Sequence, residues 1–204
     1  MEFDYERDYV FEDDEVKLSP LSKAHFDSLS TIARDPVIWQ YLVEDGLTED
    51  SLYRYLNEAL AQRLHRSSYP FVVYDKKQET VAGTTRLYEL NPDLGNIKMG
   101  HTWYGKNHRG TGINKKVKYL LFQFLFEKLK ISRIGFGVHE LNIRSIRALE
   151  SMGIKKEGVL RQFLPGNVGG SDDYRYDIVL FSLLENEWSG LRSSLEKVTV
   201  NPSI

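Results

Sequence analysis

One stretch of this sequence, residues 101–114 (HTWYGKNHRGTGIN), constrains the fold more than any other. An aromatic segment leads into a short basic loop, then into a turn with two closely spaced glycines, and then into a pattern typical of an amphipathic helix. A helix that begins at such a turn presents free backbone N–H groups and the positive end of its dipole. The sequence therefore predicts a strand, a tight turn and a helix whose N-terminus can bind an anion.

The charges around this turn all have one sign. Between Asp93 and Glu127 the sequence contains no acidic residue. The basic residues in the same interval are Lys98, Lys106, Arg109, Lys115, Lys116 and Lys118. Because the whole chain has a net charge of −2, this positive charge is a local feature. We expect a ligand with two or three negative charges to bind at the turn.

Composition excludes several classes of function. The chain has 204 residues, of which 41% are hydrophobic and 27% charged, as in an ordinary globular domain. The absence of cysteine excludes disulfides, a thiol nucleophile and thiolate zinc sites. The five histidines lack the spacing of metal ligands, so we expect no metal. An isoelectric point near 6.2 argues against a nucleic-acid partner.

The sequence also lacks the patterns that direct a chain to a membrane. Its first fifteen residues are acidic and contain no apolar run of the kind found in signal peptides. No window approaches the ~18 apolar residues that a membrane-spanning helix needs. We therefore expect a cytoplasmic protein without a membrane partner.

The hydrophobic pattern predicts a single mixed α/β domain over residues 1–204, with no linker. The predicted helices are 22–33, 49–66, 113–130 and 143–152. The predicted strands are a hairpin over 9–18 and then 70–74, 80–90, 97–104, 133–138, 155–163 and 174–181. Thr48 is expected to cap the second helix. Residues 189–204 are expected to form a C-terminal tail.

A second motif follows the strand at 133–138. Residues 142–153 read NIRSIRALESMG, and EGVLR follows at 157–161. Together with RGTGIN, these segments resemble the GNAT superfamily of acetyl-CoA-dependent N-acetyltransferases, in particular the branch of the ribosomal-protein N-terminal acetyltransferases RimJ and RimL. The resemblance implies a twisted, largely antiparallel sheet flanked by helices. It also implies a substrate-side half over 9–95 and an acetyl-CoA-binding half over 96–188.

The resemblance further implies which residues contact acetyl-CoA. The pyrophosphate would be held by the backbone N–H groups of Gly110, Thr111, Gly112, Ile113 and Asn114, with Arg109 at the start of the motif. Asn114 stands where the family usually has glycine or alanine. The strand end at Trp103 and Tyr104 would pair with the pantetheine arm and could donate an N–H to the thioester carbonyl.

Two residues of the second motif have implied roles as well. Asn142 would bond the pantetheine arm, and Ser145 would donate a proton to the departing thiolate. From the residues alone, Asn142 and Ser145 also fit a helix N-cap and its first turn, and this alternative stays open.

The general bases that members of this family use are missing. Where some members have a glutamate on the strand before the turn, this chain has Lys98, and where others have a tyrosine on the later helix, it has Leu149. His101 and Glu89 are the nearest titratable candidates. A primary amine attacks a thioester only when neutral, so an α-amine with a pKa near 8 needs less help than a lysine near 10.4.

These observations predict an enzyme that moves an acetyl group from acetyl-CoA to a primary amine by direct attack in a ternary complex. The acceptor would be a protein N-terminal α-amine or a small-molecule amine, and the protein would be a monomer or a homodimer. Because the familiar bases are missing, a catalytically idle acyl-CoA-binding sensor or interaction module of the same fold is the alternative.

Overall fold

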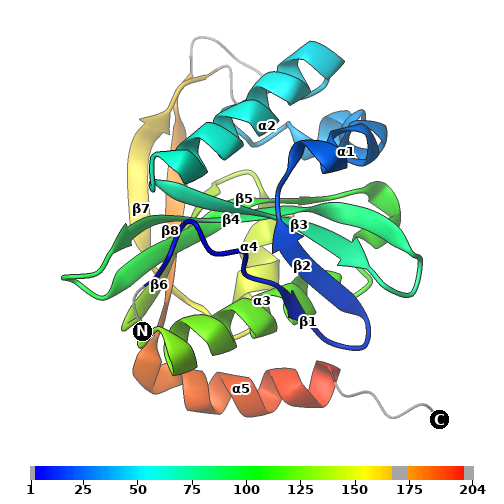
Figure 1. Ribbon diagram of the computed structural model, residues 1–204. Helices are drawn as coiled ribbons and strands as arrows, with labels where there is room; N and C mark the ends of the chain where they lie inside the picture. The colour runs from blue at the N-terminus through cyan, green and yellow to red at the C-terminus, as the bar shows by residue number, and fades with distance from the viewer. Residues whose placement is uncertain (1–2, 167–173, 200–204) are drawn as a thin grey trace.

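An eight-stranded sheet forms the centre of the computed structural model, which describes residues 3–166 and 174–199 (Figure 1). The strands are β1 (Phe11–Glu12), β2 (Val16–Pro20), β3 (Ser68–Asp75), β4 (Thr80–Asn91), β5 (Asn96–Tyr104), β6 (Arg133–His139), β7 (Lys155–Leu164) and β8 (Tyr176–Leu184). Their order in space is β1-β2-β3-β4-β5-β6-β8-β7. Every neighbouring pair is antiparallel except β5 and β6, which are parallel. The predicted mixed α/β fold with a largely antiparallel sheet is confirmed.

Helices cover both faces of this sheet. Figure 1 shows α1 (Phe26–Ala33) and α2 (Glu49–Leu64) on one face and α3 (Ile113–Gln123) and α5 (Glu185–Thr199) on the other. The remaining α-helix of the described chain, α4 (Ile143–Glu150), joins β6 to β7. Each face therefore has its own hydrophobic core, a smaller one under α1 and α2 and a larger one under α3 and α5.

Local sequence explains how α2 forms. The Thr48 hydroxyl accepts a hydrogen bond from the Ser51 amide at 3.2 Å, which confirms the predicted N-cap. Leu52, Tyr55, Leu56 and Ala59, spaced as one helical face, are all buried. This face fixes α2 on the sheet beside β3.

Several predicted boundaries differ from the structure. The helix expected over 22–33 begins with a 3₁₀ turn, Lys23–His25, and the helix expected over 113–130 continues beyond α3 as a π-helical segment, Phe124–Lys128. The hairpin expected over 9–18 has its strands at β1 and β2, with the turn near Asp13 as predicted.

The C-terminal tail expected over 189–204 needs a correction, because α5 extends through most of it. Trp188, Leu191 and Leu195 lie three and four residues apart and turn one apolar face towards the larger core. The Trp188 indole also donates a hydrogen bond to Glu127 at 3.0 Å. Residues 200–204 of the expected tail lie outside the described residues.

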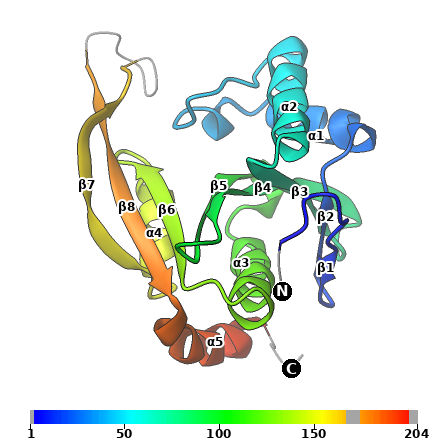
Figure 2. The ribbon, with the colours of Figure 1, turned by 60° about the vertical axis from the view of Figure 1, so that its left-hand side comes forward.

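The sheet divides between β5 and β6. These strands pair only from Asn96 to Lys98, opposite Arg133 to Gly135. Figure 2 shows the β6, β8 and β7 wing turning away from the rest of the sheet. On its other edge β5 contains a bulge, because Thr84 pairs with Trp103 whereas Arg86 pairs with Gly100. The point where β5 and β6 diverge and the bulge in β5 both lie in the second half of β5, before the turn that leads into the N-terminus of α3.

Candidate functional site

The cleft between the diverging strands holds most of the predicted site residues. Its volume is about 530 Å³, and its walls come from β5, the turn after it, α3, β6, α4 and the segment after α1. The predicted residues that line it are His101, Trp103, Tyr104, Arg109, Gly110, Gly112, Asn114, Asn142 and Ser145. Thr111 and Ile113 lie between these residues in the turn, whereas Glu89 does not line the cleft.

The turn at the head of α3 has the backbone that its glycines allow. Gly110 and Gly112 have φ values of 77° and 88°, a left-handed conformation that side chains rarely adopt. A Cβ at either position would meet nothing within 4 Å, so the space beside the turn is open. The hydrogen bonds of α3 begin with the Lys115 and Lys116 amides, both to the Gly112 carbonyl. The amides of Ile113 and Asn114 therefore precede the helical ladder and remain for a ligand.

Arg109 joins this turn to the opposite wall. Its Nε donates to the Tyr104 carbonyl at 2.8 Å, and its Nη1 contacts the Asp35 carboxylate at 2.9 Å. Its Nη2 is buried and has no hydrogen-bond partner within the described structure. A buried donor without an acceptor costs ~1–3 kcal/mol, so this nitrogen indicates where an acceptor from a ligand belongs.

The cleft is positively charged. Arg109, Lys115, Lys118 and Arg144 line it, and no aspartate or glutamate is among the described lining residues. Burial first, and then the neighbouring Arg109 charge, lowers the pKa of Arg144. Two guanidinium groups that repel one another beside a helix N-terminus favour an anionic ligand.

Three lysines of the predicted basic cluster, Lys98, Lys106 and Lys116, lie outside the cleft lining. Lys98 pairs with Glu89 at 2.6 Å, and Lys116 pairs with Glu15 at 2.7 Å. The charges of Lys98 and Lys116 are compensated by carboxylates on other faces, so the local field of the cleft depends on the remaining basic residues.

At the end of β5 the side chains are occupied and only the backbone edge is available. The Trp103 indole donates to the Tyr55 hydroxyl at 3.4 Å and packs against Trp39 in the smaller core. The Tyr104 hydroxyl donates to the Asn114 amide oxygen at 3.5 Å, and burial raises the pKa of Tyr104. β4 pairs with one edge of this segment, which leaves the other edge towards the cleft.

Asn142 caps α4. Its Oδ1 accepts the Ser145 amide at 3.1 Å, so the helix-cap interpretation of this motif is confirmed. The cap uses the amide oxygen, which leaves the Nδ2 donors for a ligand in the cleft. Ser145 lies in the first turn of the same helix and contributes to the cleft wall.

The two candidate bases have different surroundings. Burial, with a smaller effect of Arg86, lowers the pKa of His101 to about 4, and Glu44, at 3.8 Å from Nδ1, partly opposes this shift. His101 is therefore neutral at physiological pH, but its neutral imidazole is too weak a base to take a proton readily from an α-ammonium group. His101 also has a left-handed φ of 48° at the β5 bulge.

The placement of Glu89 contradicts its candidacy as the base. Its side chain is 60% exposed, lies outside the cleft lining and pairs with Lys98. A base must reach the attacking amine within hydrogen-bond distance or through one water. Glu89 lies too far along β4 to do so, because β4 and β5 pair antiparallel and Glu89 falls opposite the start of β5, away from Trp103.

The site also contains charged residues that the sequence motifs do not assign to it. Glu44 faces His101 from the loop before α2, a segment without a diagnostic pattern. Arg144 is part of the second motif, but only the fold brings it beside Arg109. Lys118 was recognised as part of the basic cluster, although nothing in that observation predicted a buried side chain.

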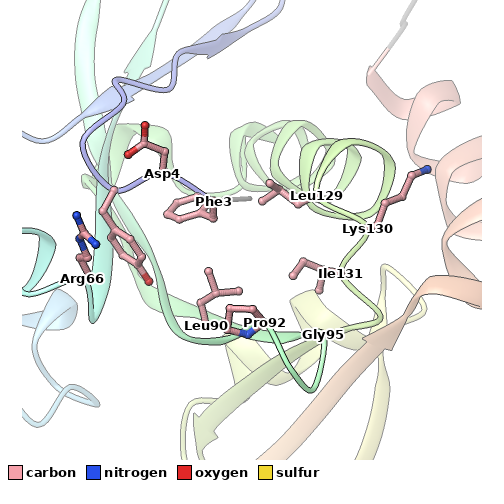
Figure 3. Close-up of a pocket in the computed structure, with 10 residues that line it drawn as sticks. Phe3, Asp4, Arg66, Leu90, Pro92, Gly95, Leu129, Lys130 and Ile131 are labelled. Carbon is pink, nitrogen blue, oxygen red and sulfur yellow. The ribbon is translucent and has the colours of Figure 1, made fainter. Parts of the chain in front are cut away.

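A second cleft, of about 830 Å³, lies beside the N-terminal segment and contains none of the predicted site residues. Figure 3 shows Phe3, Leu90, Leu129 and Ile131 around it. Its lining mixes apolar side chains with Asp4, Arg66 and Lys130, and it includes neither the glycine turn before α3 nor the first turn of α4. We therefore assign the candidate site to the cleft between β5 and β6.

Within ranges 3–166 and 174–199, no group of three or more His, Cys, Asp or Glu side chains is placed to hold a metal ion. In the same ranges, none of the helices combines the length and the apolar character that crossing a membrane requires.

Comparison with known proteins finds similarity over most of the chain. The sequence model of the acetyltransferase (GNAT) domain matches residues 15–155. An N-acetyltransferase of Bacillus licheniformis called p20, itself uncharacterized, is 27% identical over 165 residues, which are 80% of this chain and 89% of that protein.

Solved structures agree with this result. A GCN5-related N-acetyltransferase from Brucella melitensis has a TM-score of 0.85 and 26% identity, over 95% of this chain and 86% of that one. A ribosomal-protein-S5-alanine acetyltransferase from Vibrio fischeri has a TM-score of 0.71 and 18% identity, over 89% and 99% of the two chains. At 18% identity, the similarity to the Vibrio fischeri protein shows a shared fold only.

Proposed function

The chain belongs to the GNAT family of acetyl-CoA-dependent N-acetyltransferases, and we propose that it transfers acetyl to the α-amino group of a peptide, a protein N-terminus or a small molecule. Acetyl-CoA would occupy the cleft between β5 and β6, and the amine would enter from the side of residues 9–95. The observation that carries the proposal is the cationic cleft at the N-terminus of α3, whose described lining residues include no carboxylate.

The residues of the cleft fit the pyrophosphate and the pantetheine arm. We propose that Gly110, Thr111, Gly112, Ile113 and Asn114 hold the pyrophosphate through their backbone amides. The unsatisfied Nη2 of Arg109 would find its acceptor there, and Arg144 would add a second positive charge. Asn142 would donate its Nδ2 to the arm, which would lie along the free backbone edge at Trp103 and Tyr104.

For this reaction the protein mainly has to position the amine against the thioester. The amine nitrogen attacks the thioester carbonyl carbon, and a backbone N–H at the β5 bulge would stabilise the oxygen that becomes negative. Because His101 is a weak proton acceptor, the amine must already be in its neutral, deprotonated form when it attacks. This requirement favours α-amines, which lose their proton near pH 8, over lysine side chains.

The first test is ligand binding. We expect acetyl-CoA to raise the Tm measurably, by the equivalent of ~2.7 kcal/mol when its concentration is 100 times Kd. NAD and ATP should raise the Tm far less, because neither has a pantetheine arm. Differential scanning fluorimetry with matched concentrations measures this, and equal shifts with ATP and acetyl-CoA would contradict the assignment of the cleft.

The second test separates an enzyme from an idle acyl-CoA sensor. Free CoA is released only on turnover, and it can be measured with a thiol reagent without background because the chain has no cysteine. We expect release that depends on an added α-amine. A protein that binds acetyl-CoA but releases no CoA with any amine of a broad panel would be the sensor.

A third test concerns Ser145, for which we propose a hydrogen bond to the departing thiolate. Ser145→Ala should lower kcat by about 10²-fold or less, because a thiolate with a thiol pKa near 8.5 is already a fair leaving group. The CoA dissociation constant should change by less than about threefold, since one hydrogen bond contributes ~1 kcal/mol or less. An unchanged kcat would remove Ser145 from the mechanism.

A further inference from the structure

Lys118 is a buried lysine in the lining of the cleft. It lies on α3, only 5% of the side chain is exposed, and it lines the cleft. Its Nζ is 3.8 Å from the Met99 sulfur and 5.4 Å from the centre of the Phe136 ring. Met99 and Phe136 directly follow the last paired residues of β5 and β6, so the ammonium group lies where the two strands begin to diverge.

No carboxylate among the described residues forms a salt bridge with this lysine. Among the described residues, no carboxylate lies within 4.0 Å of Lys118, whose contacts are a thioether and an aromatic ring. Burial lowers the pKa of Lys118 to about 8, which still leaves most of it charged at neutral pH. A buried cation without a partner is unfavourable for folding, so its presence in a binding cleft indicates a ligand that becomes negative there.

The position of Lys118 matches one end of the proposed ligand. The pyrophosphate site is at the head of α3, and Lys118 lies five residues after Ile113, or about 7.5 Å along the helix axis. The other cations of the cleft, Arg109, Lys115 and Arg144, belong to the turn and to the first turns of α3 and α4. Lys118 is thus the basic side chain at the end of the cleft away from the pyrophosphate.

We propose that Lys118 is a catalytic residue whose ammonium group stabilises the negative charge on the CoA sulfur as the thioester is cleaved. This inference rests on the proposed function, because it requires acetyl-CoA in the cleft. Attack of the amine forms the C–N bond, and collapse of the intermediate breaks the C–S bond and leaves its electron pair on sulfur. The proton of the amine passes to water. Lys118 keeps its own proton and compensates the thiolate, while Ser145 contacts the same sulfur from α4.

Such a contact is made mainly after the C–S bond breaks. The thioester of acetyl-CoA is neutral, whereas the thiolate is an anion. The ammonium group therefore stabilises the sulfur little before the C–S bond breaks and strongly as it breaks. We therefore expect Lys118 to affect kcat and the acidity of bound CoA, and to have little effect on acetyl-CoA binding. A lysine that only filled space would affect none of these properties when replaced by a side chain of similar length.

The test uses Lys118→Met in the full chain, because methionine keeps the length and removes the charge. We expect a kcat at least tenfold lower, an acetyl-CoA dissociation constant within about threefold of wild type, and a Tm that is unchanged or higher. The thiol of enzyme-bound CoA should titrate at least one pH unit higher in the variant than in wild type. Thiolate absorbance measures this titration as the difference between the protein with and without CoA, and because the chain has no cysteine no protein thiol contributes to it.

Lys116→Met is the matched control, since Lys116 is also a buried lysine of α3 but pairs with Glu15 outside the cleft. It should leave the titration of bound CoA unchanged. Equal CoA titration in wild type and Lys118→Met would overturn the proposal, and so would a wild-type kcat in Lys118→Met. An acetyl group found on Lys118 itself after turnover would also overturn it, because an amide carries no charge. If wild type neither binds CoA nor releases it, the proposed function fails instead.

Discussion

Gly112→Val is expected to weaken CoA binding by more than about tenfold, or ~1.4 kcal/mol. Gly112 caps α3 with a φ of 88°, and the space where its Cβ would lie is open. We assign that space to the pyrophosphate, which a branched side chain would displace from the amides of Ile113 and Asn114. Isothermal titration with CoA measures the change.

The same substitution should also lower stability, because valine is strained at a left-handed φ. We expect the free energy of unfolding to fall by ~1–3 kcal/mol, as measured by denaturant titration. Gly153→Val is the matched control, since Gly153 has a φ of 79° and follows α4 outside the cleft lining. It should lose similar stability and keep its affinity for CoA.

A second variant, Gly112→Asn, separates strain from obstruction. Asparagine tolerates the left-handed region better than other residues, so stability should be largely kept while the side chain still enters the proposed phosphate space. CoA affinity should therefore fall in both Gly112 variants. If folded Gly112→Val or Gly112→Asn binds CoA as tightly as wild type, the turn has only a structural role.

The elements of this fold could be predicted from the sequence because their patterns are local. Apolar residues three and four apart predicted α2 and α3, and Thr48 and Asn142 supply caps whose hydrogen bonds involve neighbours in sequence. The helix α5 was missed although Trp188, Leu191 and Leu195 have helical spacing. The polar residues between them obscured a narrow apolar face.

The site was less predictable because it depends on contacts between distant segments. Lys118 precedes the buried Leu121 and Phe122 by three and four residues, which places it on the covered face of α3. Attention to that spacing would have predicted its burial. The approach of Glu44 to His101 depends on how the loop before α2 crosses β5, and no local pattern encodes that contact.

The bulge in β5 could not be predicted from the sequence either. His101 has a φ of 48°, and a histidine in that conformation carries no sequence signal of the kind that glycine gives. Glu89 is a candidate base in the sequence because it is titratable and belongs to a predicted central strand. The register between β4 and β5 decides which residues of these strands face the cleft. In this register Glu89 lies beside Lys98 and away from the cleft.

Peptides with a free α-amine should react at neutral pH about 10- to 250-fold faster, in kcat/KM, than matched peptides whose only amine is a lysine side chain. At pH 7 the neutral fraction of an amine with a pKa near 8 exceeds that of one near 10.4 by roughly 250-fold. The greater nucleophilicity of the more basic amine recovers part of this difference. The comparison uses one peptide with a free N-terminus and no lysine, and one with a blocked N-terminus and one lysine.

The pH profile decides whether the amine or the protein limits the reaction. With the pKa of His101 lowered to about 4, protonation of His101 occurs well below the range in which amines titrate. The acidic limb of kcat/KM should therefore follow the substrate, with a midpoint near pH 8 for the α-amine and above pH 10 for the lysine peptide. His101→Ala should leave both midpoints in place. A limb that stays at one pH for both peptides would instead belong to a base of the enzyme, and the preference for α-amines would then need another cause.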